Sequence, residues 1–324
     1  LVNIVIAAGT KPLFIDHKKN SFEMDYDKIK KIIKKNKNIS AIICTHYCLN
    51  SENFLKLKSL CKNKNIKIIQ DCAIAASSQY KNKSLANFSD YSFFSFNLFK
   101  FIPALTGGAI VTSDKKMMHF ANQEQKNYKQ FSFFDLIFVQ LKSNIIRILT
   151  SKFIYSFLIF HIFKFGELYN LEWIIKFTKN DPNPFLRKKL FDFEKKKLNQ
   201  NQLLTIEKNF LDTQKYRSIR EKNYKYLVKL IKSNKVKLFK PNKLSTHSFI
   251  NFPLLVNNKK EFRNYLFKNN YDSSKYFYRN CNELKIFKKY KQDCKNIEAF
   301  VKQLIFLPIH HKVSKNYLKN LAFL

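Results

Sequence analysis

The sequence predicts an α/β protein with a large domain built on a mostly parallel sheet and a smaller α+β domain at its carboxyl end. Over roughly the first 115 residues, short apolar runs alternate with charged helical patterns, which is typical of βαβ units. After residue 184, a long polar helical stretch is followed by a strand-like run and further helices, which indicates a separate, smaller unit. At 324 residues, the chain is long enough for one large or two medium domains.

The elements of the amino-terminal half follow from their residue patterns. Short apolar runs bounded by polar residues predict strands, and runs with lysines along one face predict helices. The expected strands are 12–16, 40–44, 66–70, 91–96 and 109–112, and the expected helices are 25–35 and 51–63. Asp71 and Lys100 therefore fall at the carboxyl ends of strands, where open α/β sheets place binding residues.

The second half divides into two parts of different character. Residues 121–195 are helical, apolar and basic, and the breaker Asp181-Pro182-Asn183-Pro184 closes their apolar part. Residues 196–324 contain the expected helical stretch 194–234, a strand over 248–256 and helices over 259–269 and after Ser314. We therefore expect three parts, 1–120, 121–195 and 196–324. Because the chain opens on Leu1 in apolar sequence, we also expect an amino-terminal part of the large domain to be missing.

The insertion holds an amphipathic helix, whose polar positions 135, 140, 142–144 and 147 fall on the face opposite the apolar one. Its uncharged runs are too short to cross a bilayer, which takes roughly 20 residues. One interpretation is a helix packed on the core or at a subunit interface. The other is a basic segment, 131–166, that lies on an anionic membrane surface. The apolar positions that share one helical face are 133, 134, 137, 138, 141, 145, 148, 149 and 153.

The net charge of +37 comes almost entirely from lysine. Only six of the 60 basic residues are arginine, whereas nucleic-acid readers usually rely on arginine for bidentate contacts. The pattern favours solvated surfaces and no nucleic-acid partner, with binding of a polyanion left as an alternative. The six cysteines form no Cys-x-x-Cys pair, and His310 and His311 are adjacent, so we expect no metal site and reduced thiols in a cytoplasmic protein.

The most informative stretch is Ser95-Phe96-Asn97-Leu98-Phe99-Lys100, which precedes the pair Gly107-Gly108 in a chain with only four glycines. A lysine on such a loop can bind an aldehyde cofactor such as pyridoxal 5'-phosphate (PLP) covalently. Asp71 can hold the pyridine nitrogen protonated, and the Ser95 hydroxyl can bind the phosphate. Each residue also has an ordinary explanation: Lys100 as a surface lysine, Asp71 as a helix or turn cap, and Ser95 as a strand end.

Several segments together resemble the DegT–StrS family of PLP-dependent sugar aminotransferases. The segments are Ile69-Gln70-Asp71-Cys72-Ala73, Tyr80-Lys81-Asn82-Lys83, the run from Ser95 to Lys100, Gly107 to Asp114, Ala8 to Asp16 and Leu307-Pro308-Ile309-His310. The resemblance implies PLP-dependent transferase fold type I, with residues 1–120 as part of the PLP-binding domain.

The resemblance also implies a role for each matching residue. Lys100 is similar to the Schiff-base lysine, Asp71 to the partner of the pyridine nitrogen and Ser95 to a phosphate ligand. It implies a homodimer that transfers an amino group, usually from glutamate, to a nucleotide-linked keto-sugar for surface polysaccharide synthesis.

Other positions depart from the family pattern. Ile74 stands where members usually carry Gln or His, Leu105-Thr106 replaces Gly-Glu, and residues 196–202 show no match to the Asn-x-Arg region. These departures and the apolar insertion support an alternative: a catalytically weakened PLP-fold protein that acts as a partner-docked or membrane-docked subunit.

Overall fold

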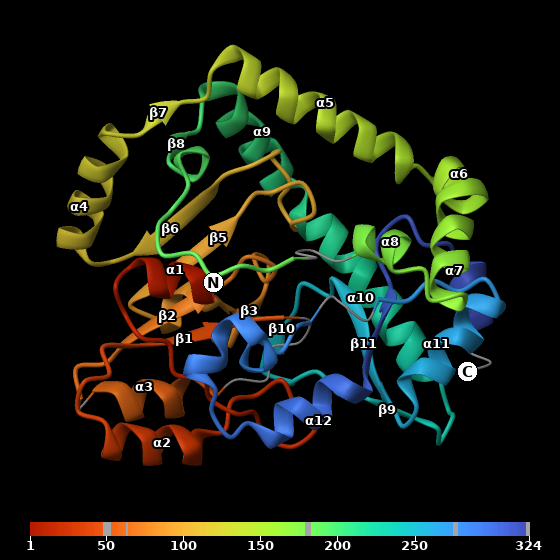
Figure 1. Ribbon diagram of the computed structural model, residues 1–324, viewed down its shortest axis with the longest axis horizontal. Helices are drawn as coiled ribbons and strands as arrows, with labels where there is room; N and C mark the ends of the chain where they lie inside the picture. The colour runs from red at the N-terminus through yellow and green to blue at the C-terminus, as the bar shows by residue number, and fades with distance from the viewer. Residues whose placement is uncertain (48–52, 63, 179–182, 275–277, 322–324) are drawn as a thin grey trace.

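The computed structural model describes residues 1–324 except 48–52, 63, 179–182, 275–277 and 322–324, and it also leaves the side chain of residue 193 undescribed. Two sheets organise these residues, one in each half of the chain (Figure 1). The expected helix start at Ser51 and the breaker residues Asp181 and Pro182 lie outside the described residues.

The amino-terminal sheet has the strand order β1-β2-β5-β6. The first three strands are parallel and β6 runs antiparallel to β5, which confirms the mostly parallel sheet expected from the sequence. The register places Thr45 beside Asp71 and Asp71 beside Phe93. The strands are β1 (Ala41–Thr45), β2 (Lys67–Asp71), β5 (Tyr91–Ser95) and β6 (Gly108–Thr112).

Helices cover one face of this sheet more completely than the other. Helix α2 (Tyr26–Lys35) begins at Asp25, whose side chain accepts hydrogen bonds from the N–H groups of Asp27 and Lys28. It packs with α3 (Phe54–Lys62) against Ile42 and Ile68, on the lower side of the sheet in Figure 1. The opposite face, which carries Asp71 and Phe93, is only half-buried.

The expected strand over 12–16 is wrong. This segment has extended backbone but pairs with no strand among the described residues, apart from an isolated bridge between His17 and Met24. Its apolar side chain Phe14 packs against the carboxyl-terminal core instead. The Asp16 side chain is fully buried, where it accepts hydrogen bonds from Lys28 Nζ at 2.7 Å and from the Ile297 N–H at 2.9 Å. The segment therefore links α2 to the carboxyl-terminal unit.

A three-stranded antiparallel sheet, β12-β11-β9, forms the centre of the carboxyl-terminal unit. Strand β11 is buried from Phe252 to Val256, which agrees with the strand expected over 248–256. The expected helices over 194–234 and 259–269 and after Ser314 are also present, the first of them divided in two. The elements are α9 (Gln200–Leu211), α10 (Thr213–Leu230), β9 (Val236–Leu238), β10 (Ser245–Thr246), β11 (Asn251–Val256), α11 (Lys259–Lys268), α12 (Lys295–Gln303), β12 (Leu304–Pro308) and α13 (Lys315–Asn320), with 3-10 turns at Cys281–Glu283 and Lys285–Tyr290.

The helical insertion leaves and rejoins the body at one place. Strand β7 (Lys129–Gln130) pairs in parallel with β8 (Lys196–Lys197), so the residues between them form a single excursion. Along it, α5 runs across the upper edge of the molecule in Figure 1 and α7 reaches α11. The elements of the excursion are α5 (Phe133–Leu149), α6 (Lys152–Ile154), a π-helical turn (Tyr155–Ile159), α7 (Phe160–Leu168), α8 (Glu172–Ile175) and 3-10 turns at Lys176–Thr178 and Asp192–Glu194.

The remaining elements flank the amino-terminal sheet. They are α1 (Val2–Ala7), β3 (Gln79–Tyr80), β4 (Lys83–Ser84), the 3-10 turn Leu85–Phe88 and α4 (Lys115–Lys126). Strands β3 and β4 form a hairpin that pairs with β10, and this pairing joins the two halves of the chain.

Candidate active site

Asp71 and Ser95 lie at the ends of neighbouring strands. Asp71 is the last residue of β2 and is paired with Phe93 of β5, so Ser95 stands two residues further along the adjacent strand. Since side chains two apart on a strand share a face, Asp71, Phe93 and Ser95 lie on the same, half-buried face of the sheet. The strand ends therefore place a carboxylate and a hydroxyl on one surface.

The surroundings of the Asp71 carboxyl have opposing effects on its pKa. Its Oδ1 accepts a hydrogen bond of 3.0 Å from the N–H of Ala73, which stabilises the turn after β2. Burial raises the pKa of the Asp71 carboxyl, whereas the Ala73 hydrogen bond and the positive charge of Lys100 offset part of that rise. The charge of Lys100 thus acts on Asp71, although the two residues are far apart in sequence.

The loop that holds Lys100 is anchored by its neighbours. The N–H of Lys100 donates to the carbonyl of Asn97 at 2.9 Å, and that of Ala104 donates to the carbonyl of Phe96 at 2.7 Å. Phe101 and Ile102 are 5% and 3% exposed, so they fix the backbone that directly follows the turn. The Lys100 side chain is half-buried, and within the described residues its ammonium group makes no hydrogen bond or ion pair.

The glycine pair allows β6 to return close to β5. Gly107 has φ +105°, in the region that disfavours other residues, and its carbonyl accepts the N–H of Phe96 at 2.9 Å. A Cβ at Gly108 would lie 2.7 Å from the carbonyl oxygen of Phe94, closer than van der Waals contact permits. The pair is therefore required by the tight approach of the strand that follows the Lys100 loop.

The segment Tyr80-Lys81-Asn82-Lys83 is a two-residue hairpin. Lys81 and Asn82 have φ of 48° and 60°, which is the backbone of a type I′ turn between β3 and β4. The N–H of Lys81 also donates to the carbonyl of Leu244 at 2.7 Å. This motif therefore has a structural role, which is to join the amino-terminal half to β10.

Sequence reasoning missed a buried pair directly behind Asp71. Nε2 of His46 donates to Oε1 of Gln70 at 2.9 Å in the tautomer that this contact requires, and the His46 N–H donates to the Asp71 carbonyl at 3.1 Å. Burial lowers the pKa of His46 to about 4, so the ring is neutral near pH 7. The signal in the sequence was a histidine directly after a strand, where apolar neighbours predict burial.

A second missed feature is a buried cation beside the Lys100 loop. The guanidinium of Arg220, on α10, lies 4.9 Å from the ring centre of Phe101, the residue after Lys100. Its Nε and Nη1 are buried and have no hydrogen-bond partner among the described residues, and burial lowers its pKa to about 10. Burial and the charge of Arg220 together lower the pKa of His310 to about 4. The rarity of arginine in this chain could have directed attention to Arg220.

These residues are suited to hold PLP. The cofactor needs an amine, a carboxylate and a phosphate-binding hydroxyl, and the side chains of Lys100 and Ser95 have unused hydrogen-bonding capacity in the described part of the chain. Among the described residues, the Asp71 carboxyl accepts a single hydrogen bond, from the N–H of Ala73 to Oδ1. The described residues form no cluster of three or more His, Cys, Asp or Glu side chains that could hold a metal ion.

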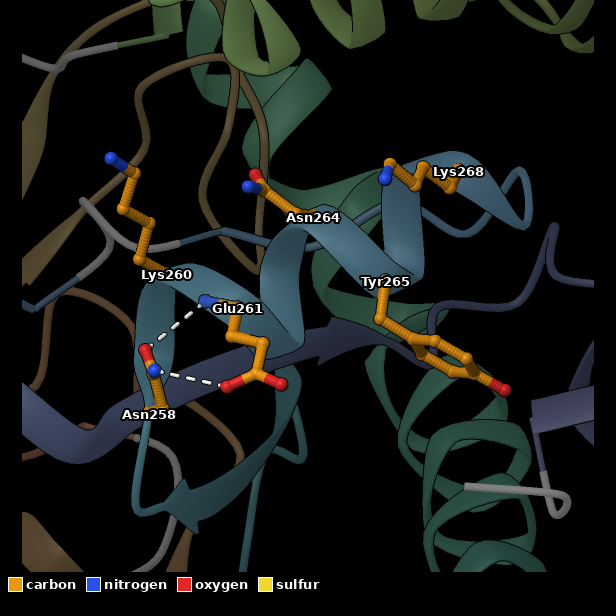
Figure 2. Close-up of a pocket in the computed structure, with 6 residues that line it drawn as sticks. All are labelled: Asn258, Lys260, Glu261, Asn264, Tyr265 and Lys268. Atoms are coloured by element: carbon orange, nitrogen blue, oxygen red, sulfur yellow. Dashed lines mark hydrogen bonds between the residues drawn. The ribbon is translucent and has the colours of Figure 1, made fainter.

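A shallow depression of about 490 Å³ lies elsewhere, on α11 (Figure 2). Its lining residues all belong to α11 or to the cap before it. Asn258 Nδ2 donates to Glu261 Oε2 at 3.0 Å, and the Glu261 N–H donates to Asn258 Oδ1 at 3.2 Å, so these polar groups serve to cap the helix (Figure 2). We assign no chemistry to this depression. It is lined by Asn258, Lys260, Glu261, Asn264, Tyr265 and Lys268.

The sequence model of the DegT/DnrJ/EryC1/StrS aminotransferase family matches residues 1–132 and 196–322. The chain is similar to GDP-perosamine synthase of Escherichia coli O157:H7, with 34% identity over 135 residues, 40% of this chain and 36% of that protein. It is also similar to UDP-4-amino-4,6-dideoxy-N-acetyl-beta-L-altrosamine transaminase of Campylobacter jejuni, with 34% identity over 117 residues, 36% of this chain and 31% of that protein. The matched part thus spans about a third of the length of these relatives.

The fold is that of solved sugar aminotransferases. A Streptococcus pneumoniae structure, described as a sugar aminotransferase in its PLP form, superposes with a TM-score of 0.71 at 15% identity, over 99% of this chain and 75% of that one. The expected transferase fold is therefore confirmed. The family match leaves out the excursion between β7 and β8.

Proposed function

Because the chain belongs to the DegT/DnrJ/EryC1/StrS aminotransferase family, we propose that it transfers an amino group to a nucleotide-linked keto-sugar with PLP as cofactor. The named relatives act on GDP- and UDP-linked sugars, which supports this substrate class. The proposal includes glutamate as the donor and surface polysaccharide synthesis as the purpose. The observation that carries it is the convergence of Asp71 and Ser95 on one sheet face, with the charge of Lys100 acting on Asp71.

Each of the three residues has one task in this proposal. When bound, PLP supplies an electron sink that eases proton removal from the carbon bearing the amine. The Lys100 amine binds the cofactor and moves the proton at that carbon. The Asp71 carboxylate keeps the pyridine nitrogen protonated, and the Ser95 hydroxyl donates to the phosphate.

The proposal extends to a homodimeric, cytoplasmic enzyme that contacts the inner face of the membrane through residues 131–166. Exposed apolar side chains on α9, among them Leu204 and Leu211 at 52% and 76%, support a subunit contact there. The five described cysteines are free, which fits a reducing compartment. Exposed aromatic residues of α5 support the membrane contact.

The decisive experiment is cofactor loading of Lys100→Ala. We expect the wild-type chain to show the absorption band of lysine-bound PLP and the variant to lack it. Amino transfer from glutamate to a panel of nucleotide-linked keto-sugars should fall by about 10²- to 10⁴-fold. Lys116→Ala, which alters an exposed lysine of α4, is the matched control and should retain both properties.

Two further outcomes separate the alternatives. Asp71→Asn should still bind PLP but turn over slowly, because the amide cannot hold the ring nitrogen protonated. A wild-type chain that binds PLP without turnover on any keto-sugar would support the weakened, docked subunit instead. A colourless wild-type protein that ignores added PLP would refute both.

A further inference from the structure

Helix α5 exposes the apolar side of an amphipathic helix. Phe134 is 80% exposed, Phe138 69% and Ile145 57%, whereas the small polar residue Ser143 on the opposite side is buried. We call the exposed apolar residues of this helix the α5 face. Soluble helices normally show the reverse arrangement. The α5 face consists of Phe133, Phe134, Ile137, Phe138, Leu141, Ile145, Ile148 and Leu149, and Phe153 and Phe157 continue the exposed apolar surface beyond it.

The excursion is attached to the body before and after α5, so α5 is held in this orientation. At its start, Ser132 and Asp135 form a capping box, and Asp135 also pairs with Lys196 of β8. Beyond α5, Glu167 of α7 forms a buried ion pair with Arg263 of α11, with an Oε2–Nη1 distance of 2.7 Å. Tyr155 also donates to Asp272 at 2.7 Å. Both attachments leave the α5 face free of protein contacts that would bury it.

Cations lie at the margins of the α5 face. Lys142 and Arg147 are exposed on the two sides of the apolar stripe, and Lys152 follows at the start of α6. None of the three forms an ion pair among the described residues. Asp135 is the single acidic residue in 131–166, and Lys196 neutralises it. An apolar stripe with cationic margins is complementary to an anionic bilayer, where apolar groups enter the acyl boundary and cations meet lipid phosphates.

Two other occupants fit this surface less well. In the described part of the chain, no single helix is long and apolar enough to cross a membrane, and the pair Phe133–Leu149 and Lys152–Leu168 meets that test only jointly, with a 55° bend. The bend is unfavourable for a straight span but suits a helix that lies along a surface. A second copy packed on the same face, with the two-fold axis near the middle of α5, would bring Lys142 close to the identical lysine.

From these observations we infer that the α5 face binds the headgroup region of an anionic bilayer, with α5 parallel to the membrane plane. This deepens the peripheral contact included in the proposed function and is independent of amino transfer. The family match omits this excursion, so the contact would be an addition to the aminotransferase body.

Flotation of the 324-residue chain with lipid vesicles tests this inference without cofactor or substrate. We expect binding to phosphatidylcholine vesicles that contain phosphatidylglycerol and little binding to pure phosphatidylcholine. The variant Phe134→Ser/Phe138→Ser/Leu141→Ser should lose this binding. Lys142→Gln/Arg147→Gln/Lys152→Gln should bind about fivefold more weakly for each cation removed.

The matched control is Met118→Ser/Phe120→Ser on α4, which removes exposed apolar groups elsewhere and should leave flotation unchanged. Because all substituted side chains are exposed, circular dichroism should show native folding for every variant. A second measurement uses Phe138→Trp in a Trp173→Phe background, which leaves one tryptophan, on the α5 face. Brominated lipids should quench its fluorescence.

Three results would overturn the inference. They are equal flotation of wild type and the Phe134/Phe138/Leu141 variant, equal binding to neutral and anionic vesicles, and absence of quenching at residue 138. Loss of a dimer in that variant, together with unchanged flotation, would instead assign the α5 face to a second copy.

Discussion

Helices α2 and α5 have similar amphipathic patterns but opposite orientations. In α2, Tyr26 and Ile29 are 1% and 0% exposed, whereas Lys30, Lys31, Lys34 and Lys35 are exposed on the other side of the helix. In α5, Phe134 and Phe138 point to solvent. Periodicity therefore identifies an apolar face in both helices but does not say whether the protein itself covers that face.

The difference lies in what each helix rests on. Helix α2 packs against the apolar face of β1 and β2, where Ile42 and Ile68 are buried. Helix α5 belongs to an excursion that is attached through Asp135, in the first turn of α5, and through Glu167, on α7. The first interpretation of the insertion was a helix packed on the core or at a subunit interface. Its first half is wrong for α5, and the subunit interface stays a prediction.

The largest effect should come from breaking the attachment of the excursion. Glu167→Ala leaves Arg263 buried without its carboxylate partner and should lower the free energy of unfolding by about 3–5 kcal/mol. Urea denaturation followed by circular dichroism measures this change. Asp192→Ala, at an exposed residue of the 3-10 turn Asp192–Glu194, is a control for loss of an acidic residue in the same excursion. An equal effect of both substitutions would contradict the role of the ion pair.

Alanine substitutions test the contrast between α2 and α5 directly. Ile29→Ala creates a cavity in the core and should lower the free energy of unfolding by about 2–5 kcal/mol. Ile145→Ala, at a residue that is 57% exposed, should change it by no more than about 0.5 kcal/mol. A large loss of unfolding free energy in Ile145→Ala would show that α5 is packed more tightly than its exposure indicates.

Asp16 provides a pH-dependent test of how α2 is attached. Burial alone would raise the pKa of Asp16, but hydrogen bonds from Lys28, Ile297 and Asn296 hold it below its usual 3.8. A lowered pKa stabilises the folded state at pH values above 3.8, and this contribution disappears as pH falls through the folded-state pKa. Asp16→Asn should lower the free energy of unfolding by about 1–3 kcal/mol at pH 7.

The comparison of melting temperatures at pH 7 and near pH 3 measures this contribution. The difference between wild type and Asp16→Asn should shrink at the lower pH. Asp27→Asn, at an exposed residue of α2, should have little effect at either pH. If wild type and Asp16→Asn differ in melting temperature by the same amount at both pH values, the charge of Asp16 does not contribute to stability.

The smallest expected change in the free energy of unfolding comes from replacing Arg220, and this replacement should raise the free energy where the others lower it. Arg220→Met removes a buried guanidinium whose Nε and Nη1 have no partner in the described structure, so the free energy of unfolding should rise by about 1 kcal/mol. Arg217→Met should lower it, because Arg217 donates to Gln214 at 2.8 Å and to Thr246 at 3.3 Å. Thermal denaturation distinguishes the two. A loss of stability in Arg220→Met would show that its contact with Phe101 dominates.

Local signals identified most of the fold because they depend on neighbours in sequence. Alternation of apolar strands and lysine-rich helices predicted β1, β2, β5, β6 and α2. The glycine pair predicted the tight return after the Lys100 loop, and Gly108 does lie against Phe94. The predicted strand over 12–16 was wrong because an apolar run is typical both of a strand and of an unpaired segment that packs on a core.

The candidate site was partly predictable for the same reason. The order Asp71, Ser95 and Lys100 along the chain predicted residues at strand ends, and their roles remain predictions. His46 and Arg220 were not predicted, because their burial depends on elements distant in sequence.

The sequence by itself determined the strands, the helices, their apolar faces and the residue types able to bind PLP, since these follow from side-chain chemistry and short-range spacing. Only the tertiary structure decided that Asp71 and Ser95 share one sheet face, that Asp16 links α2 to α12, and that α5 turns its apolar face outward. The physical reason is that burial and electrostatic coupling depend on which surfaces meet, and sequence spacing alone does not specify those surfaces.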